Sequence, residues 1–352
     1  MPRDNGKHIL QVGCGAIGSF LEELLARMPN VARITLVDHD TYQESNLRRQ
    51  HINRGDVGQL KVAVLARRLR AANPQLDVTA IPAAVEDVPL GVLRADLILA
   101  CVDSRLARQT INETAWRLRS PWIDSGVLES EALARVNVYA PAADAACLEC
   151  AWSSDDYKSL ESEYPCGATV GAERPSDTSS ALASLASSLL AIECQKMLSG
   201  DESHAAIGRQ VTVDARSLRL LSTSFRRNPR CSFDHASWEI VPLRCSLRRF
   251  TVADALAITG RLRVAGHRFA RALVCPACGF RLDGLCLDRP KARCTKCRAR
   301  MTPPDFGGLL DQLDASLPVE CLSRTLAQVG LRSGDVVCGA EKQFELLTEG
   351  VV

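Results

Sequence analysis

The first 140 residues alternate strand-like and helix-like segments, and this alternation constrains the fold more than any other feature of the chain. Short apolar runs typical of buried parallel strands lie at residues 9–12, 34–37, 78–81 and 97–102, with a further strand around Trp122. Apolar residues at helical spacing mark the segments between them, at residues 16–28, 58–72 and 105–118. Such alternation predicts an α/β fold with a doubly wound, mostly parallel sheet.

The pattern changes after residue 140, and a chain of 352 residues is long enough for two domains. Residues 141–176 hold few apolar positions and predict a long loop. Residues 177–198 predict a helix of small residues, and residues 209–225 predict a β-hairpin. Because the composition shifts near residue 250, we expect one domain over residues 1–250 and a smaller one over residues 251–352.

Composition excludes several classes of protein. Apolar residues make up 46% of the chain and charged residues 24%, which is ordinary for a soluble globular protein. No apolar run is long enough to span a membrane, and the start lacks the cleavage site of a signal peptide, so we expect a cytoplasmic protein. The net charge of +2 predicts no global attraction to nucleic acid or membrane. Fifteen cysteines in a reducing compartment favour metal ligands, nucleophiles or core residues over disulfides.

A glycine motif of the form G-x-G-x-x-G joins the first strand to the first helix. Its glycines are Gly13, Gly15 and Gly18. They allow a tight turn, and the following helix offers free N–H groups to a phosphate. Asp38 ends the next strand, where its carboxylate can bind a ribose hydroxyl. These features predict a Rossmann-like nucleotide site, and the alternative is a glycine turn without a ligand.

A charged segment follows Asp38 directly. It holds a second carboxylate at Asp40, an amide at Asn46 and two arginines that include Arg49, with Lys61 further on. A nicotinamide cofactor does not need so much positive charge beside its adenosine, whereas a triphosphate does. The segment therefore favours ATP, and the alternative is a solvated charged loop.

Asp103 follows the fourth strand, at the sheet edge where open α/β folds bind ligands. A carboxylate near a triphosphate is a natural Mg²⁺ ligand. The alternative role for Asp103 is to cap the helix predicted from residue 105, and one side chain can serve both purposes.

These motifs together resemble the ubiquitin-activating-enzyme-like adenylyltransferases of the ThiF/MoeB/HesA family, over about residues 8–235. The chain carries in order G-x-G-x-x-G, D-x-D-x(4)-SNL-x-RQ, the lysine of VG-x-x-K and the aspartate after the fourth strand. The resemblance implies an adenylation fold that binds Mg-ATP. It assigns Asp38 to the ribose, Asn46, Arg49 and Lys61 to the phosphates, Asp40 to the reacting carboxylate and Asp103 to Mg²⁺.

The same resemblance implies a homodimer that acts on a ubiquitin-like or sulfur-carrier β-grasp protein. The tail of that protein threads under a crossover loop, here residues 151–176. Cys166 occupies the loop of the family's catalytic cysteine and is expected to form a thioester or a persulfide; the alternative is an unreactive thiol. Cys194 lies in an apolar helix and is expected in the core. Family members begin with an arginine that reaches the partner's ATP, but Arg3 is the only arginine before the first strand here.

Cys147 and Cys150 form a C-x-x-C pair, which needs further ligands to complete a zinc site. Relatives complete a structural zinc site with cysteines that follow an Asn-Pro pair. The resemblance assigns that role here to Cys231 and, at one extra spacing, to His235. The alternatives are Cys245 as the fourth ligand, and a pair of free thiols.

The C-terminal domain carries a second, stronger zinc signature. Two C-x-x-C pairs separated by 15 residues predict a zinc ribbon, with Cys286 as a bystander, and its ligands are Cys275, Cys278, Cys294 and Cys297. Residues 261–300 hold eleven Lys or Arg against two Asp, a local charge of +9 that leaves −7 for the rest of the chain. This charge suits nucleic acid or an acidic protein, and few stacking aromatics lie nearby, which disfavours single-strand recognition. A third interpretation is a small domain that needs zinc because its core is small.

We therefore expect an ATP-dependent enzyme that adenylates the C-terminal carboxylate of a ubiquitin-like protein, forms a thioester on Cys166 and transfers the acyl group to a conjugating enzyme. In this interpretation residues 250–352 recruit a protein partner, and nucleic acid is not expected. The alternatives are a sulfur-carrier adenylyltransferase of the thiamin or molybdopterin type, a nicotinamide-dependent oxidoreductase, and a scaffold with a degenerate adenylation fold.

Overall fold

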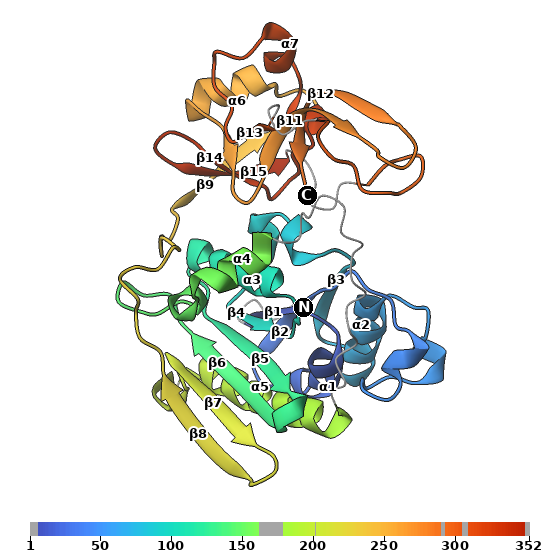
Figure 1. Cartoon of the computed structure of the whole chain (residues 1–352), viewed down its shortest axis with the longest axis vertical. Coiled ribbons are helices and arrows are strands. Elements are labelled where there is room, and N and C mark those ends of the chain that lie inside the picture. Colours follow the sequence, from blue (N-terminus) through green and yellow to red (C-terminus); the bar gives the residue numbers. More distant parts are fainter. Residues whose placement is uncertain (1–5, 162–178, 201, 290–292, 305–308, 349–352) are drawn as a thin grey trace. The chain divides into compact units, whose positions relative to one another are not determined.

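The computed structural model describes residues 6–161, 179–200, 202–289, 293–304 and 309–348 (Figure 1). The chain forms two compact units. The first unit consists of Met1–Val85 and Arg94–Ser237, and the second of Glu86–Leu93 and Trp238–Val352. Each unit has a hydrophobic core of its own.

The first unit is built on an eight-stranded sheet with the order β3-β2-β1-β4-β5-β6-β7-β8. Its strands are β1 (Lys7–Val12), β2 (Val31–Val37), β3 (Asp77–Ile81), β4 (Leu97–Ala100), β5 (Trp122–Leu128), β6 (Leu133–Tyr139), β7 (Arg209–Asp214) and β8 (Arg219–Ser224). The five strands from β3 to β5 are parallel, and the last three run antiparallel. The predicted doubly wound sheet and the predicted hairpin at residues 209–225 are both confirmed.

Four main helices cover this sheet (Figure 1). They are α1 (Ala16–Leu25), α2 (Lys61–Ala72), α3 (Arg105–Leu118) and α5 (Ser180–Leu198). Helix α5 is long and apolar enough to cross a membrane, but 56% of that window is buried inside the structure. It packs on α1, β5 and β6, and the Ser187 hydroxyl donates to the Ile17 carbonyl at 2.6 Å. Among the described residues, α5 is therefore a core helix of the first unit.

The segment predicted as a long loop, residues 141–176, contains more structure than its composition suggested. It includes a 3₁₀ turn, η6 (Leu148–Ala151), and a two-turn helix, α4 (Ser154–Glu161). Glu149 is 3% exposed and accepts hydrogen bonds from Gln109, Asn112 and Tyr157. One buried carboxylate thus orders a stretch that has few apolar residues. Residues 162–176 lie outside the described part.

The second unit combines a four-stranded sheet with a three-stranded ribbon, in the orders β10-β14-β15-β9 and β12-β11-β13. Its strands are β9 (Ile240–Cys245), β10 (Arg263–Val264), β11 (Arg268–Val274), β12 (Arg281–Asp288), β13 (Leu309–Leu310), β14 (Val336–Cys338) and β15 (Gln343–Thr348), and its helices are α6 (Val252–Thr259), α7 (Val319–Leu322) and α8 (Leu326–Val329).

The second unit begins at Trp238, which differs from the boundary expected near residue 250. The reason is that β9 pairs in parallel with β15, almost 100 residues later, so β9 belongs to the C-terminal sheet. Residues Glu86–Leu93 also belong to this unit, and the Gly91 amide donates to the Gly334 carbonyl at 2.9 Å. Neither pairing leaves a local mark in the sequence.

Candidate nucleotide and zinc sites

The glycine loop connects β1 to α1, and two of its three glycines are required by packing. Gly13 has φ +92°, and a Cβ there would lie 2.3 Å from the Cys101 carbonyl oxygen. A Cβ on Gly18 would lie 2.2 Å from the Gly13 carbonyl oxygen. Nothing lies within 4 Å of a Cβ built on Gly15, which precedes α1 without any side-chain cap. The open position at Gly15 and the uncapped N–H groups of α1 leave room for a phosphate.

Buried Gln11 holds this loop in shape. Its amide nitrogen donates to the carbonyls of Gly13 and Gly18, both at 3.1 Å. The hydroxyl of Tyr42 adds a third bond, to the Cys14 carbonyl at 3.0 Å. A lone polar residue within the first apolar run was the sequence signal for Gln11, and sequence reasoning did not use it.

Asp38 follows β2 and lies directly beside the glycine loop. Its carboxylate accepts the Cys14 N–H at 2.7 Å and the Asp40 N–H at 2.8 Å. One bond thus joins the ends of β1 and β2, and the other shapes the chain that leads to Asp40. The strand order places β1 between β2 and β4, in the middle of the five parallel strands, where the connections of an open α/β sheet diverge and ligands bind.

Asp40 and Lys61 form an ion pair at the entrance to α2. The Lys61 ammonium lies 2.8 Å from the Asp40 carboxylate, and the lysine side chain is only 10% exposed. Burial alone lowers the pKa of Lys61, but Asp38 and Asp40 outweigh burial and raise that pKa. Lys61 is therefore a permanent, largely desolvated cation that is held beside the glycine loop.

The segment between these two residues is a closed loop. The Tyr42 amide donates to the Gln59 carbonyl at 2.9 Å, and the Gly58 amide donates to the Tyr42 carbonyl at 2.8 Å. Asn46 ends the turn η1 (Glu44–Asn46), and its side chain accepts the Gln43 amide at 2.8 Å. Arg49 follows η1 and is partly exposed.

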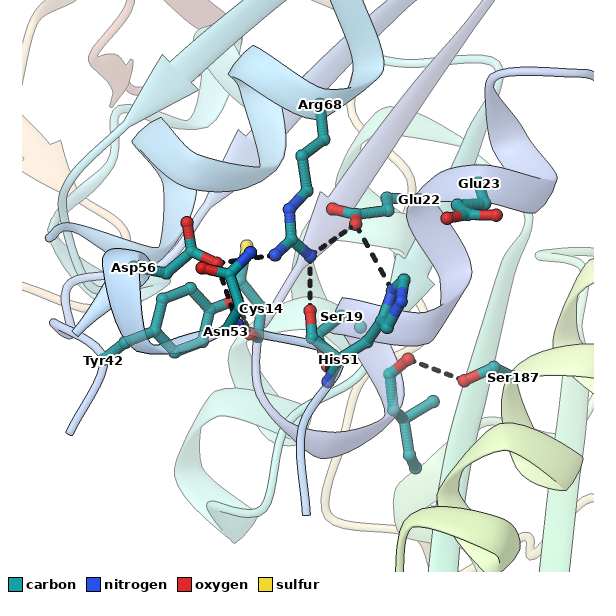
Figure 2. Close-up of polar contacts among 12 residues, drawn as sticks. Cys14, Ser19, Glu22, Glu23, Tyr42, His51, Asn53, Asp56, Arg68 and Ser187 are labelled. Carbon is teal, nitrogen blue, oxygen red and sulfur yellow. Dashed lines mark hydrogen bonds and ion pairs between the residues drawn. The ribbon is translucent and has the colours of Figure 1, made fainter. Parts of the chain in front are cut away.

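Arg68, a partly buried residue of α2 that sequence reasoning missed, joins this loop to α1 (Figure 2). The Arg68 guanidinium lies 2.9 Å from Glu22 of α1 and 2.6 Å from Asp56 of the loop, and it also donates to the His51 carbonyl. The carboxylates of Glu22 and Asp56 are almost fully buried. Arg68 lies two helical turns after Lys61 on α2, which is the signal that could have identified it.

Asp103 follows β4, so the ends of β1, β2 and β4 carry the glycine loop, Asp38 and Asp103 respectively. The helix-capping role that we considered for Asp103 belongs to Ser104, whose hydroxyl accepts the Ala107 amide at 3.3 Å. The carboxylate of Asp103 is exposed and remains available to a cation. The main chain before it is held by Arg108, which donates to the carbonyls of Val102 at 2.5 Å and Asp103 at 3.3 Å.

Arg108 is in turn held by Asp124, a second group that sequence reasoning missed. Asp124 lies in β5 and is 0% exposed. Its carboxylate pairs with Arg108 at 2.8 Å and Arg135 at 2.9 Å, and it accepts a hydrogen bond from Asn137 at 3.1 Å. These bonds supply the partners that a buried carboxylate needs, and they position the segment that carries Asp103.

The structure brings together the four residues predicted for the first zinc site: Cys147, Cys150, Cys231 and His235. The Cys147 sulfur lies 3.8 Å from that of Cys150 and 3.8 Å from that of Cys231. Two thiolates on one zinc, each at about 2.3 Å, lie about 3.8 Å apart in a tetrahedron. The donor set and its spacing therefore fit zinc, whereas Cys245 is packed in the core of the second unit.

His235 is oriented as a metal ligand. Its Nδ1 lies 2.7 Å from the Phe233 carbonyl, which makes Nδ1 the donor and leaves Nε2 facing the Cys150 sulfur at 3.3 Å. Burial and the nearby Arg227 lower the pKa of His235, so the ring is neutral, as a zinc ligand must be.

The ribbon cysteines also converge. The sulfur atoms of Cys275 and Cys297 lie 3.4 Å apart, and those of Cys278 and Cys294 lie 3.5 Å apart. All four ligand atoms lie within 4.8 Å of one another, which fits a Cys₄ zinc site. Cys286 is a bystander as expected, because it is 4% exposed and packs in the small core of the ribbon.

The predicted nucleophile, Cys166, lies outside the described residues. Cys194 is a core residue as expected: it is 0% exposed, and burial raises its pKa to about 12. Such a buried thiol has little thiolate character and is not a nucleophile.

Comparison with known proteins agrees with this geometry. The model of the ThiF family matches residues 5–233. Molybdopterin-synthase adenylyltransferase of Escherichia coli is 29% identical over 227 residues, which cover 63% of this chain and 85% of that protein. Ubiquitin-like modifier-activating enzyme 5 of Oryza sativa is 29% identical over 179 residues, 45% of this chain and 42% of that protein. The chain thus spans less than half the length of the plant enzyme.

A crystal structure of Escherichia coli MccB with ATP shares the fold. Its TM-score is 0.52 at 23% identity, and the match covers 65% of this chain and 66% of that one. The family match includes the glycine loop, Asp38, Lys61, Asp103 and the three cysteines of the first zinc site, and it ends two residues before His235. Because it covers well over half of the sequence, the chain belongs to the ThiF family.

Proposed function

We propose that this chain is an ATP-dependent adenylyltransferase that activates the C-terminal carboxylate of a ubiquitin-like or sulfur-carrier protein. The observation that carries the proposal is the convergence of four groups at the ends of β1, β2 and β4. These are the open glycine loop, the Asp38 carboxylate, the Lys61–Asp40 pair and Asp103. The names of the relatives support the same activity.

For this reaction the protein mainly has to position the substrate carboxylate and ATP and to neutralise the charge of the phosphates. A carboxylate oxygen of the substrate bonds to the α-phosphorus, and the bond to pyrophosphate breaks with its electron pair leaving on pyrophosphate. No general base is needed, because the attacking carboxylate is already ionised at neutral pH. Lys61 and Arg49 offset the charge of the phosphates, and Asp103 would hold the Mg²⁺ that shields them. The ion pair with Asp40 keeps Lys61 in place before ATP arrives.

We further propose that the Cys166 thiolate attacks the acyl adenylate, forming a thioester and releasing AMP, before transfer to a conjugating enzyme. Two copies of the chain would form a homodimer. The two zinc sites have no open position in their donor sets and would be structural.

The alternative to the thioester step is sulfur transfer, as in a sulfur-carrier adenylyltransferase, and the length of the matches supports this alternative. The match covers 85% and 84% of the two Escherichia coli adenylyltransferases, but only 42% of the plant ubiquitin-like enzyme. In this case the adenylate would react with a sulfur donor. A persulfide on Cys166, detected by mass spectrometry, would support it over the thioester.

The test is ATP–[³²P]pyrophosphate exchange with β-grasp proteins encoded beside this gene. Wild type should exchange, Asp103→Ala should lose exchange, and Cys166→Ala should retain it, because the cysteine acts after adenylation. Asp77→Ala is the matched control, since this exposed aspartate starts β3 at the opposite edge of the sheet. Equal exchange by Asp103→Ala and Asp77→Ala would exclude the proposed role of Asp103. No exchange with any β-grasp protein would favour the alternative of a non-catalytic scaffold with a degenerate adenylation fold.

A further inference from the structure

The two metal-binding turns of the ribbon have the same backbone but differ at one position. In the first, the Cys275 amide donates to the Phe280 carbonyl, and the Gly279 amide donates to the Cys275 carbonyl. In the second, the Cys294 amide donates to the Ala299 carbonyl, and the Arg298 amide donates to the Cys294 carbonyl. Position 279 in the first turn therefore corresponds to position 298 in the second.

This shared position has a left-handed backbone, with φ 70° at Gly279 and φ 62° at Arg298. Glycine adopts this conformation without strain, whereas a residue with a Cβ is disfavoured there. The first turn has glycine at this position, so its backbone carries no such strain. The second turn holds an exposed arginine at a strained position, and its side chain has no ion-pair partner within the part of the chain that is described.

Other cations surround Arg298 on this turn. Arg293 lies directly opposite Arg300 in an antiparallel bridge, an arrangement in which like charges repel. The Lys296 ammonium lies 5.1 Å from the centre of the Phe280 ring, so a cation covers the aromatic ring of the first turn. We call Arg293, Lys296, Arg298 and Arg300 the basic knuckle.

The basic knuckle differs from other arginines of the same ribbon. Arg268 pairs with Asp311 at 2.9 Å, and Arg281 pairs with Asp283. Within the described ranges, Arg293, Lys296 and Arg298 are exposed and pair with no carboxylate. Like-charge repulsion and backbone strain at this turn both destabilise the fold. An anionic partner would relieve the repulsion between the cations.

We propose that the basic knuckle docks an acidic face of the protein whose carboxylate is activated. This rests on the proposed function, in which such a protein is the substrate whether the pathway is ubiquitin-like or sulfur-carrying. The Lys296 ammonium lies over the Phe280 ring, and the ring is partly buried against the small core of the ribbon, which disfavours the stacking of a nucleic-acid base on it.

The test measures binding of a fluorescein-labelled deca-glutamate peptide to the full-length, zinc-loaded chain by fluorescence anisotropy. The triple variant Arg293→Glu, Lys296→Glu, Arg298→Glu should bind roughly tenfold more weakly than wild type. The control is Arg244→Glu, Arg248→Glu, Arg249→Glu, which changes the net charge equally at exposed arginines of the same unit. The control should change affinity by less than about twofold.

Equal weakening in both triple variants would overturn the proposal, because overall charge would then explain binding. Tighter binding of a 20-base-pair DNA duplex than of the peptide, lost in the knuckle variant, would replace it with a nucleic-acid site. If the triple variant loses zinc, the single variant Arg298→Gly replaces it in the test. Glycine occupies the corresponding position of the first turn, so this change removes one charge without disturbing the backbone. This variant should bind the peptide roughly threefold more weakly; unchanged binding would also overturn the proposal.

The assay contains neither ATP nor a carrier protein. Its failure is therefore distinguishable from failure of the proposed adenylation, which the pyrophosphate exchange measures separately.

Discussion

Glu22 should make the first unit less stable as the pH rises from 5 to 8, which is unusual for a carboxylate in an ion pair. Its side chain is 1% exposed, and one oxygen lies 2.9 Å from Arg68 and 3.6 Å from the His51 ring (Figure 2). The other oxygen, Oε2, has no hydrogen-bond partner among the described residues. Burial raises the pKa of Glu22 to about 7 in spite of Arg68, and the Glu23 and Asp56 carboxylates add to the rise.

The sign and the size of the effect follow from the two pKa values. An ordinary glutamate, as in the unfolded chain, has a pKa of 4.5. Between pH 4.5 and about 7 the folded state therefore binds the proton more tightly, and stability falls as the pH rises. A difference of about 2.5 pKa units is worth about 3 kcal/mol, and this full cost is present above pH 7.

Glu22→Gln removes this ionisation and keeps an oxygen that accepts from Arg68. At pH 5 wild type and variant should unfold at similar temperatures, because both side chains are neutral in the folded state. At pH 8 the variant should unfold at a temperature roughly 6–12 °C higher, from about 2–4 °C per kcal/mol for a domain of this size. Thermal unfolding can be followed by tryptophan fluorescence, since three of the four tryptophans lie in the first unit.

Glu23→Gln is the matched control, because this neighbouring glutamate is 56% exposed. It removes the same charge from the same helix, and its effect on the melting temperature should change far less between pH 5 and pH 8, because Glu23 is only one of the smaller causes of the raised pKa of Glu22. The reasoning is refuted if the Glu22→Gln difference is the same at both pH values, or if the variant becomes the less stable protein at pH 8.

Three further perturbations test other parts of the first unit. His235→Ala should lower the zinc content, measured by atomic emission, from two ions per chain toward one; two retained ions would exclude His235 as a ligand. Gly13→Ala should cost at least about 2 kcal/mol in urea unfolding, because it combines a left-handed φ with a Cβ 2.3 Å from a carbonyl oxygen, and an unchanged midpoint would contradict this. Arg108→Ala should cost about 3 kcal/mol, since it leaves the buried Asp124 with one guanidinium instead of two. Arg105→Ala removes a more exposed ion pair and should cost less than about 1 kcal/mol, so equal losses would argue against the positioning role of Arg108.

Local physical chemistry made much of this protein predictable from its sequence. A strand of four to seven residues and a helix of ten or more each leave a periodic pattern, so the elements from β1 to α3 were predicted close to their observed bounds. The glycine loop, Asp38 and the four ribbon cysteines were predictable for the same reason, since the residues that act together lie close in sequence or at the ends of adjacent strands.

Only the tertiary structure decided the features that join distant segments. Cys147 and His235 are 88 positions apart, and no local pattern could choose His235 over Cys245 as a partner; the fold decides, because Cys245 is packed in another core. The parallel pairing of β9 with β15 likewise moved the start of the second unit to Trp238.

The buried charges show the same limit. Glu22, Asp56 and Arg68 each look like ordinary surface residues of a charged helix or loop, and Asp124 looks like a break in an apolar strand. Their importance comes from the burial of the carboxylates of Glu22, Asp56 and Asp124. A buried charge without a partner destabilises the folded state, so each ion pair holds its two segments in a defined position. Burial is a property of the folded chain, because it depends on segments that the local sequence does not contain. The sequence alone therefore determined which elements and motifs exist, and the tertiary structure determined which charges hold them in position.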